Sequence, residues 1–460
     1  MTPTLTRQSS FLVAAPVVRD KEADLRRLLL TMNHLPGTAD PDNPLVPFGR
    51  FGALHFARFV ILNDATLGDL SVFGPDAEFP DAPVYLAFQG ECDGPADMLL
   101  AELANRAGDG LRRIFAFCRD FDPGGDLLQW MRRNSVKPSA SYVNWIGRTV
   151  RQIHEEAALH QALTEYLAEY LADGSSADKA RYQPQAIRNA LVSKVREYGP
   201  RLPSSTPTSL GWRVWRLLYL LLPIAVIVVF PALVLPCDAA LNVYAAALLI
   251  IAIAVLVFLV LLRRHETLDP DVQSAPIPPS DAHLAALGAL QDHDVTNQYA
   301  AFGSFKPGWF SRWTTTVVWW LVDLATPILY PHGNLARIKT IHFAHWIFLD
   351  GKRRGLFVSN YDGSSESYMD DFVNKVSFGL NLTFSRGVGY PRTRFLLGGG
   401  ASLEQDFKNV QRRHALPTEV WYKAYPGLTL VDIARNTRIR QALVRGTMAD
   451  SEIRQWLSEV

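Results

Sequence analysis

The chain has 460 residues, of which 48% are hydrophobic, so it is long enough for two or three domains with buried cores. Its formal net charge is +1 and it has no long basic run, so nothing in its charge points to nucleic acid as a partner. Its three cysteines, Cys92, Cys118 and Cys237, form no Cys-x-x-Cys motif and no metal-ligand spacing, which argues against a disulfide framework or a zinc site. The polar segment Met1–Ser10 lacks the apolar core of a signal peptide, and we expect a cytoplasmic N-terminus.

The N-terminal part of the chain predicts three strands and two helices. Phe11 to Val18 is apolar and predicts a strand, and Lys21 to Met32 carries leucines at helical spacing. His55 to Asp64 is rich in aromatic and β-branched residues and ends in a turn signal, so it predicts a second strand. Val84 to Gln89 predicts a third strand, and the turn at Asp93-Gly94 leads into a further helix. We assign residues 1–135 to this first domain.

Residues 136–208 are expected to form a helical connector. Val143 to Asp173 has an amphipathic pattern typical of a helix. Tyr182 to Arg201 predicts a further helix or a helix pair. A segment rich in proline and serine, Pro203 to Pro207, links the connector to the apolar middle of the chain.

Two apolar segments at 209–265 predict a transmembrane hairpin. Leu217 to Leu235 and Ala239 to Leu262 are each close to the ~20 residues that span a hydrocarbon layer of ~30 Å. Pro223 and Pro231 are expected to kink the first arm or to mark a re-entrant shape. The alternative is a helical hairpin buried in a large soluble core.

Charges beside the two apolar segments predict their orientation. The turn at Pro236-Cys237-Asp238 contains no Lys or Arg. Basic residues stand before the first segment and after the second, at Arg213, Arg216, Arg263 and Arg264. Because basic flanks stay in the cytoplasm, we expect a multi-pass protein of the inner membrane with cytoplasmic soluble domains.

The C-terminal part, residues 296–460, comes after a linker at 266–295 and repeats the earlier order of elements. Asn297 to Phe305 predicts a strand, and the aromatic stretch 309–330 predicts a helix on the membrane surface or an amphipathic core helix. Strands are expected at His342 to Gly351 and at Gly355 to Ser359, and a fourth at Leu428 to Ile433.

The two parts match in register as well as in order. His55 and its neighbours read like His342 and its neighbours, and each unit continues to an Asp-Gly, at Asp93 and Asp362. The distance from that aspartate to the next matching glycine is 17 positions in both units. We therefore expect an α+β protein with two tandem ferredoxin-like units, joined by the transmembrane hairpin.

This order of elements resembles the dimeric α+β barrel superfamily, which includes the dye-decolorizing peroxidases. The resemblance covers roughly residues 10–120 and 295–435 and implies that the two units pair into a pseudo-dimeric barrel. Asn360-Tyr361-Asp362-Gly363 resembles the Gly-x-x-Asp-Gly stretch of those peroxidases, whose aspartate helps to activate peroxide. Ser359 stands where their first glycine would be. A turn or a helix cap is the alternative role for Asp362, since the Asp-Gly occurs in both units.

Three histidines are candidates for binding or catalysis. Alternation along a strand places His342 on one face and His345 on the other, and Arg58 is the counterpart of His345. If either face lines a barrel, a histidine there could hold haem iron or transfer protons near neutral pH. The alternative is a hydrogen-bonded histidine within a strand, which applies equally to His55.

A segment rich in glycine and arginine, Gly387 to Ala401, has no copy in the first unit. Its backbone amides and the guanidinium groups of Arg392 and Arg394 could bind an anion. The segment lacks the spacing of nucleotide-binding glycine motifs, and a flexible loop with surface arginines is the alternative. We expect a ligand pocket between the sheets or at the rim of the second one, near His345, Arg392 and Arg394.

Three functions are compatible with these features. The first is a membrane-anchored accessory or ligand-binding protein with a tandem ferredoxin-like cytoplasmic module. The second is a membrane-bound, peroxidase-like oxidoreductase that uses haem or a lipophilic substrate, and the third is a lipid-modifying enzyme. The expected partners are the lipid bilayer and a lipophilic or anionic small molecule. No motif decides whether the chain is an enzyme or identifies a protein partner.

Overall fold

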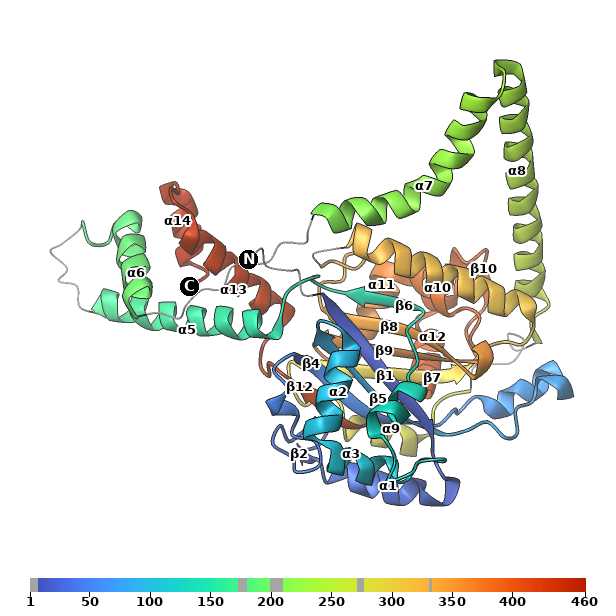
Figure 1. Cartoon of the computed structure of the whole chain (residues 1–460), viewed down its shortest axis with the longest axis horizontal. Helices are drawn as coiled ribbons and strands as arrows, with labels where there is room; N and C mark the ends of the chain where they lie inside the picture. Colours follow the sequence, from blue (N-terminus) through green and yellow to red (C-terminus); the bar gives the residue numbers. More distant parts are fainter. Residues whose placement is uncertain (1–6, 173–179, 199–209, 271–276, 331–332) are drawn as a thin grey trace.

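Two four-stranded antiparallel sheets lie at the centre of the structure (Figure 1). The computed structural model describes residues 7–172, 180–198, 210–270, 277–330 and 333–460. The sheets stack face to face, and helices cover their outer faces, so four layers succeed one another as helix, sheet, sheet and helix.

The first sheet has the strand order β1-β5-β4-β12. Its strands are β1 (Gln8–Pro16), β4 (Leu54–Leu62), β5 (Tyr85–Asp93) and β12 (Thr418–Lys423). The short strands β2 (Asn33–Leu35) and β3 (Thr38–Ala39) pair beside it. Its outer face packs against four helices, which are α1 (Glu22–Leu30), α2 (Ala96–Arg106), α3 (Gly108–Phe115) and α4 (Leu127–Arg133).

The second sheet has the equivalent order, β7-β9-β8-β6. Its strands are β6 (Ala140–Val143), β7 (Thr296–Ser304), β8 (Ile341–Leu349) and β9 (Arg354–Asp362). Its outer face packs against α9 (Asp281–Gly288), α10 (Trp309–Leu329), α11 (Ser365–Phe384) and α12 (Glu404–His414). Helix α9 therefore lies in the stretch that was expected to be a linker.

An apolar layer joins the inner faces of the two sheets. Val60 and Ala87 of the first sheet belong to one cluster with Ile347 and Val358 of the second. No ladder of hydrogen bonds joins the two sheets among the described strands, so the expected pseudo-dimeric barrel is not shown. What the structure shows is two stacked sheets.

Each sheet is completed by a strand from the other half of the chain. Strand β12, near the C-terminus, pairs with β4, and β6, which precedes the apolar helices, pairs with β8. The cores reflect the same exchange, because Val420 of β12 packs in the first core and Tyr142 of β6 in the second. The connector that was expected to be helical thus contains a strand.

The prediction of a fourth strand at residues 428–433 is wrong. Thr429 and Asp432 form a capping box there, so that stretch begins helix α13 (Leu430–Val444) instead. The strand lies earlier, at Thr418–Lys423, where every residue is buried.

Helices α13 and α14 (Asp450–Leu457) pack with α5 (Val150–Ala172) and α6 (Pro184–Tyr198) beside the sheets (Figure 1). Their apolar contacts surround a buried polar group, because Glu156 of α5 accepts hydrogen bonds from Thr437 and Arg440 of α13. Helices α5 and α13 are the next helices in the chain after the exchanged strands β6 and β12.

Helices α7 (Leu210–Val234) and α8 (Cys237–Thr267) project away from the sheets (Figure 1). Within the described residues one helix, α8, is long and apolar enough to cross a membrane, judged by length and composition, and only 6% of its most apolar window is buried. Helix α7 continues through Pro223 and Pro231 as one element. The structure therefore has one candidate span where two were predicted, and the hairpin stays a prediction.

Helix α10 occupies the predicted aromatic stretch and has two different faces. Val318 and Trp319 are buried against the second sheet and its helices, and Phe310 is buried against Leu262 of α8 and Leu396. On the other face, Trp309 and Trp313 are each 64% exposed. The helix packs on the sheet and presents apolar side chains outward at the same time.

Because the sheets share strands, we predict that the two halves unfold together. Met131→Ala removes a fully buried side chain from the first core and should cost about 2–5 kcal/mol. Hydrogen exchange of the detergent-solubilised protein should then accelerate by at least about tenfold in β8 and β9 as well as in the first sheet. Met98→Ala, at a position that is 70% exposed, is the control. Acceleration confined to the first sheet would contradict the prediction.

Candidate functional site

The two histidines predicted to be equivalent each contact the aspartate of their own unit. His55 Nε2 lies 3.0 Å from Asp93 Oδ1, and His342 Nε2 lies 2.8 Å from Asp362 Oδ1. Both histidines stand where the strand register shifts, between β4 and β5 and between β8 and β9. The same local irregularity thus directs each imidazole to its carboxylate.

Both aspartates also bind the start of a helix. Asp93 Oδ2 accepts a hydrogen bond of 2.9 Å from the Val150 amide of α5, and Asp362 Oδ2 accepts one of 2.7 Å from the Leu430 amide of α13. A carboxylate at this position satisfies a free amide and complements the helix dipole. These contacts agree with the alternative role of the aspartates as helix caps. The helix that each aspartate caps is the one that follows an exchanged strand, α5 for Asp93 and α13 for Asp362. Ser364 caps the helix that comes after Asp362.

Tyr425 lies between the two His–Asp pairs. Its hydroxyl is 3.1 Å from His55 Nδ1, and its ring stacks at 6.1 Å from that of His342. Burial raises the pKa of Tyr425 well above its ordinary value, so the phenol stays protonated. The adjoining cavity of about 20 Å³ has space for about one water molecule. The contacts make this cluster a structural junction, and a catalytic role for His55, His342 or Asp362 stays a prediction.

His345 and its counterpart Arg58, one of the two pairs that alternation placed on a common face, contact the opposite sheet across the gap between the sheets. His345 Nε2 lies 3.2 Å from Glu91 Oε1 of the first sheet, and Arg58 donates to Asn360 Oδ1 of the second. Each polar residue thus contacts the opposite sheet. All four are at least 97% buried.

Burial and neighbouring charges shift the pKa values of Arg58 and Glu91 in this cluster. Burial lowers the pKa of Arg58 to about 10, which keeps it charged at neutral pH. Burial alone would raise the pKa of Glu91, but the hydrogen bond and charge of His345 and the charge of Arg58 hold it below its ordinary value. These side chains contact one another across the space where a ligand pocket was expected.

Arg392 and Arg394 lie apart from His345, and both are exposed. Their segment folds into a small hairpin of β10 (Thr393–Arg394) and β11 (Gly398–Gly399). At Gly400, with φ +58°, a side chain would begin 2.0 Å from Asn381 Oδ1, which explains a glycine there.

The hairpin anchors the end of α8. The buried carboxylate of Glu266 accepts hydrogen bonds of 2.8 Å from Thr393 Oγ1, 2.8 Å from the Phe395 amide and 3.0 Å from the Leu396 amide. Binding of an anion by Arg392 and Arg394 stays a prediction. The contacts present in the structure join the candidate membrane helix to the β10–β11 hairpin.

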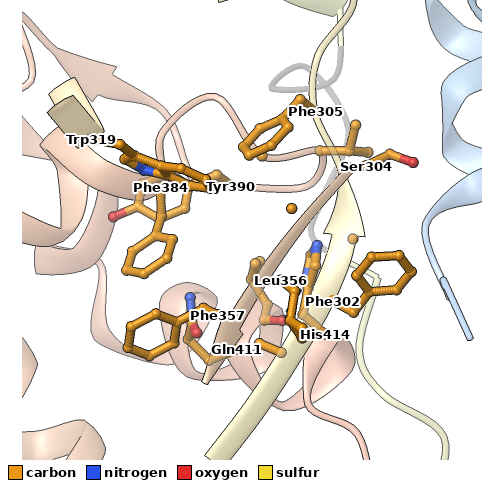
Figure 2. Close-up of a pocket in the computed structure, with 16 residues that line it drawn as sticks. Phe302, Ser304, Phe305, Trp319, Leu356, Phe357, Phe384, Tyr390, Gln411 and His414 are labelled. Carbon is orange, nitrogen blue, oxygen red and sulfur yellow. Dashed lines mark hydrogen bonds between the residues drawn. The ribbon is translucent and has the colours of Figure 1, made fainter. Parts of the chain in front are cut away.

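An aromatic cavity of about 60 Å³ lies between the second sheet and α10 to α12 (Figure 2). Its principal side chains come from four elements and two connecting segments, and they are Phe305, Trp319, Phe357, Phe384, Tyr390 and His414. Glycines make room for two of these rings. A side chain at Gly303 would begin 2.3 Å from the His414 ring, and one at Gly355 would begin 2.5 Å from the Phe305 ring.

His414 is the one titratable imidazole beside this cavity, and it was not among the histidines selected from the sequence. Burial lowers its pKa, so the ring is neutral near pH 7. Nδ1 lies 2.8 Å from the Val410 carbonyl and must donate to it, which leaves Nε2 as an acceptor. No spacing motif marks this residue, because its neighbour Gly303 is far away in the chain.

The cavity tests the haem hypothesis. A histidine whose Nδ1–H is bound to a carbonyl has the orientation that metal ligands use. The volume of about 60 Å³ is far below the ~300–1,000 Å³ of pockets for ligands of that size, so a haem does not fit here. Within the described residues no group of three or more His, Cys, Asp or Glu side chains is placed to hold a metal ion.

No known protein family, curated protein or solved structure matches this sequence. Function is therefore inferred from the side chains and cavities of this chain.

The Glu91–His345 contact predicts a specific pH dependence of stability. The pKa of Glu91 is lower in the folded than in the unfolded protein, so its contribution is present above about pH 4.5 and is lost as pH falls through the lowered pKa. Glu91→Gln should lower the free energy of unfolding at pH 7 by about 3–5 kcal/mol, because His345 and Arg58 lose their buried partner. Between pH 5 and 3 the variant should lose less stability than the parent.

Thermal unfolding of the detergent-solubilised protein at several pH values measures both effects. Glu102→Gln, on the exposed face of α2, is the control and should behave like the parent. Parallel pH curves for the parent and Glu91→Gln would rule out the charged pair.

Proposed function

We propose that this chain is a membrane-anchored ligand-binding protein. Its two-sheet body lies on the cytoplasmic face of the membrane and holds a small apolar group in the cavity behind α10. The observation that carries this proposal is the double role of α10, whose inner face lines the cavity and whose outer face is apolar and exposed.

The outer face of α10 supports membrane contact. Its exposed apolar residues recur mostly at helical spacing, and they are Trp309, Trp313, Val317, Trp320, Leu321 and Leu329. Tryptophan is enriched at the boundary between lipid and water, and a helix with such a face lies in that boundary. The adjoining α8 exposes apolar residues along its length, as a helix surrounded by lipid would.

Charge supports the orientation. Arg263 and Arg264 come after the apolar part of α8, while Asp238 lies at its other end. With α7 as a second arm, both ends of the hairpin would be cytoplasmic, and the chain would be a multi-pass protein of the inner membrane.

The position of the cavity favours an apolar ligand that arrives from the lipid. Trp319 lines the cavity, and the next residue, Trp320, is on the exposed face of the same helix. The lining is mostly apolar and includes six aromatic side chains, and His414 and Gln411 are polar groups that could fix one polar atom of the ligand. The volume suits a small part of a molecule, such as a methyl group or part of a chain.

The proposal includes duplication of a ferredoxin-like unit. Equivalent strand orders, equivalent register shifts and equivalent His–Asp contacts support it. In this interpretation the two units exchanged their fourth strands.

A second candidate is a membrane-bound oxidoreductase with a lipophilic substrate. The neutral His414, with Nε2 as an acceptor, is the observation that favours it, because such a ring could take a proton from a substrate in the cavity. Because a haem does not fit this cavity, the candidate predicts redox turnover of a lipophilic substrate by purified protein that shows no Soret band.

Cys237 provides a test of membrane topology. It is exposed at the start of α8, whereas Cys92 and Cys118 are buried and burial raises their pKa values to about 11 and about 12. An impermeant maleimide should therefore label only Cys237, and it should do so from outside intact cells. Cys237→Ser should abolish labelling. Labelling that requires cell lysis would contradict the orientation.

Filling the aromatic cavity tests ligand binding. Val410→Phe places a ring in the cavity, and Val431→Phe makes the same change on an exposed face of α13 as a control. Mass spectrometry of lipid-soluble compounds that co-purify with the protein should find an apolar species in the parent and in Val431→Phe. Its amount should fall at least about tenfold in Val410→Phe, provided that circular dichroism shows an unchanged fold. Equal amounts in all three proteins, or no such species in the parent, would contradict ligand binding in this cavity.

A further inference from the structure

A second and larger cavity, of about 300 Å³, lies where α8 meets the sheets. Its polar lining comes from the end of α8, the loop after β7, the start of α10 and the loop after α11. These residues are Arg264, His265, Asp269, Lys306, Ser311 and Arg386. None of them lines the aromatic cavity.

The lining carries an excess of positive charge. Arg264, Lys306 and Arg386 are cationic, and Asp269 is the one carboxylate among the lining residues. Lys306 Nζ lies 2.7 Å from Asp269 Oδ2, and the charges of Asp269 and Glu266 also favour the cationic form of Arg386, so the lining residues keep an excess of two positive charges. The nearby carboxylate of Glu266 is held by the β10–β11 hairpin and by Arg263, at 3.3 Å.

Arg386 is the most informative member of this lining. Its side chain is 96% buried, and its Nε has no hydrogen-bond partner among the described residues. A buried guanidinium without full compensation is costly, and an anion with several oxygens would satisfy it. Its position is fixed, because it lies 5.9 Å from the centre of the Phe310 ring, on which His265 stacks.

The cavity lies at the depth where lipid headgroups would be. The apolar part of α8 ends at Leu262, and Arg264 comes within one helical turn of it. Trp309, at the start of α10, is exposed beside it and has the amphipathic character of an interfacial anchor. Figure 1 shows the lower end of α8 beside α10.

We propose that this cavity binds the phosphate of an anionic membrane phospholipid, with its acyl chains along α8. Arg386 donates to the phosphate from the buried end of the cavity, and Arg264 does so from the open side. Basic pockets at the cytoplasmic end of membrane helices recognise such headgroups through this chemistry. The inference rests on the proposed membrane anchoring, but it concerns a site separate from the aromatic cavity.

The test is native mass spectrometry of the full chain in detergent with equimolar phosphatidylglycerol and phosphatidylcholine. We expect the parent to retain one phosphatidylglycerol in preference to phosphatidylcholine. Arg264→Gln and Arg386→Gln should each reduce this retention at least about tenfold, because each removes a charge-assisted hydrogen bond. Arg113→Gln, which removes an exposed charge from α3 on the outer side of the first sheet, should match the parent.

Arg386→Lys keeps the buried charge and should retain more lipid than Arg386→Gln, which separates charge loss from misfolding. Equal retention of both lipids, or unchanged retention in Arg264→Gln and Arg386→Gln, would overturn the proposal. Displacement of the lipid by millimolar inorganic phosphate would show a site for free phosphate and would overturn the lipid assignment.

Flotation on vesicles of phosphatidylcholine alone tests membrane anchoring separately. If the parent fails to float, the anchoring proposal is wrong, and titration with soluble dihexanoyl phosphatidylglycerol still tests the cavity. Saturable binding that Arg264→Gln weakens would then support a headgroup site without an anchor. Absence of binding would overturn the site as well.

Discussion

The pairing of β12 with β4, and of β6 with β8, is the constraint on which the rest of this structure depends. Each exchanged strand closes one edge of a sheet that the other half of the chain supplies, and this removes an exposed edge from each sheet. The helix after each exchanged strand is held by an aspartate of the sheet that the strand does not join. This aspartate is Asp93 for α5 and Asp362 for α13. Connectivity, edge protection and helix capping thus depend on one exchange.

Local sequence pattern was sufficient for the elements whose partners lie nearby in the chain. The correspondence of His55 with His342 was predictable because the spacing to Asp93 and Asp362 is repeated, and the structure gives both pairs equivalent contacts. The helix at Trp309–Leu329 was predictable because apolar and aromatic residues recur along one long stretch of the chain. The exchange itself was not predictable, since no short-range pattern shows that Thr418–Lys423 pairs with a strand far away in the chain.

The candidate sites could be predicted only in part for the same reason, because their residues come from distant parts of the chain. The ring of His414 packs against Gly303, and Arg386 lines a cavity together with the end of α8. Both neighbours are far away in the chain, so no short sequence motif marks either residue. Arg392 and Arg394 were selected because a glycine run beside arginines resembles an anion site. The glycines instead allow a tight hairpin whose amides bind Glu266. Composition marked this segment as unusual, but only the fold shows that its backbone holds α8.

The exchanged strand β12 also has a consequence during synthesis. The ribosome delivers β4 early, but the strand that covers its edge emerges roughly 350 residues later, which at ~5–20 residues per second takes about 20–70 s. During this interval the nascent first sheet is incomplete, although the apolar helices α7 and α8 have already been made. The first sheet therefore keeps one edge open until the C-terminal part of the chain has been made, and chaperone protection of that edge would be most valuable in this period.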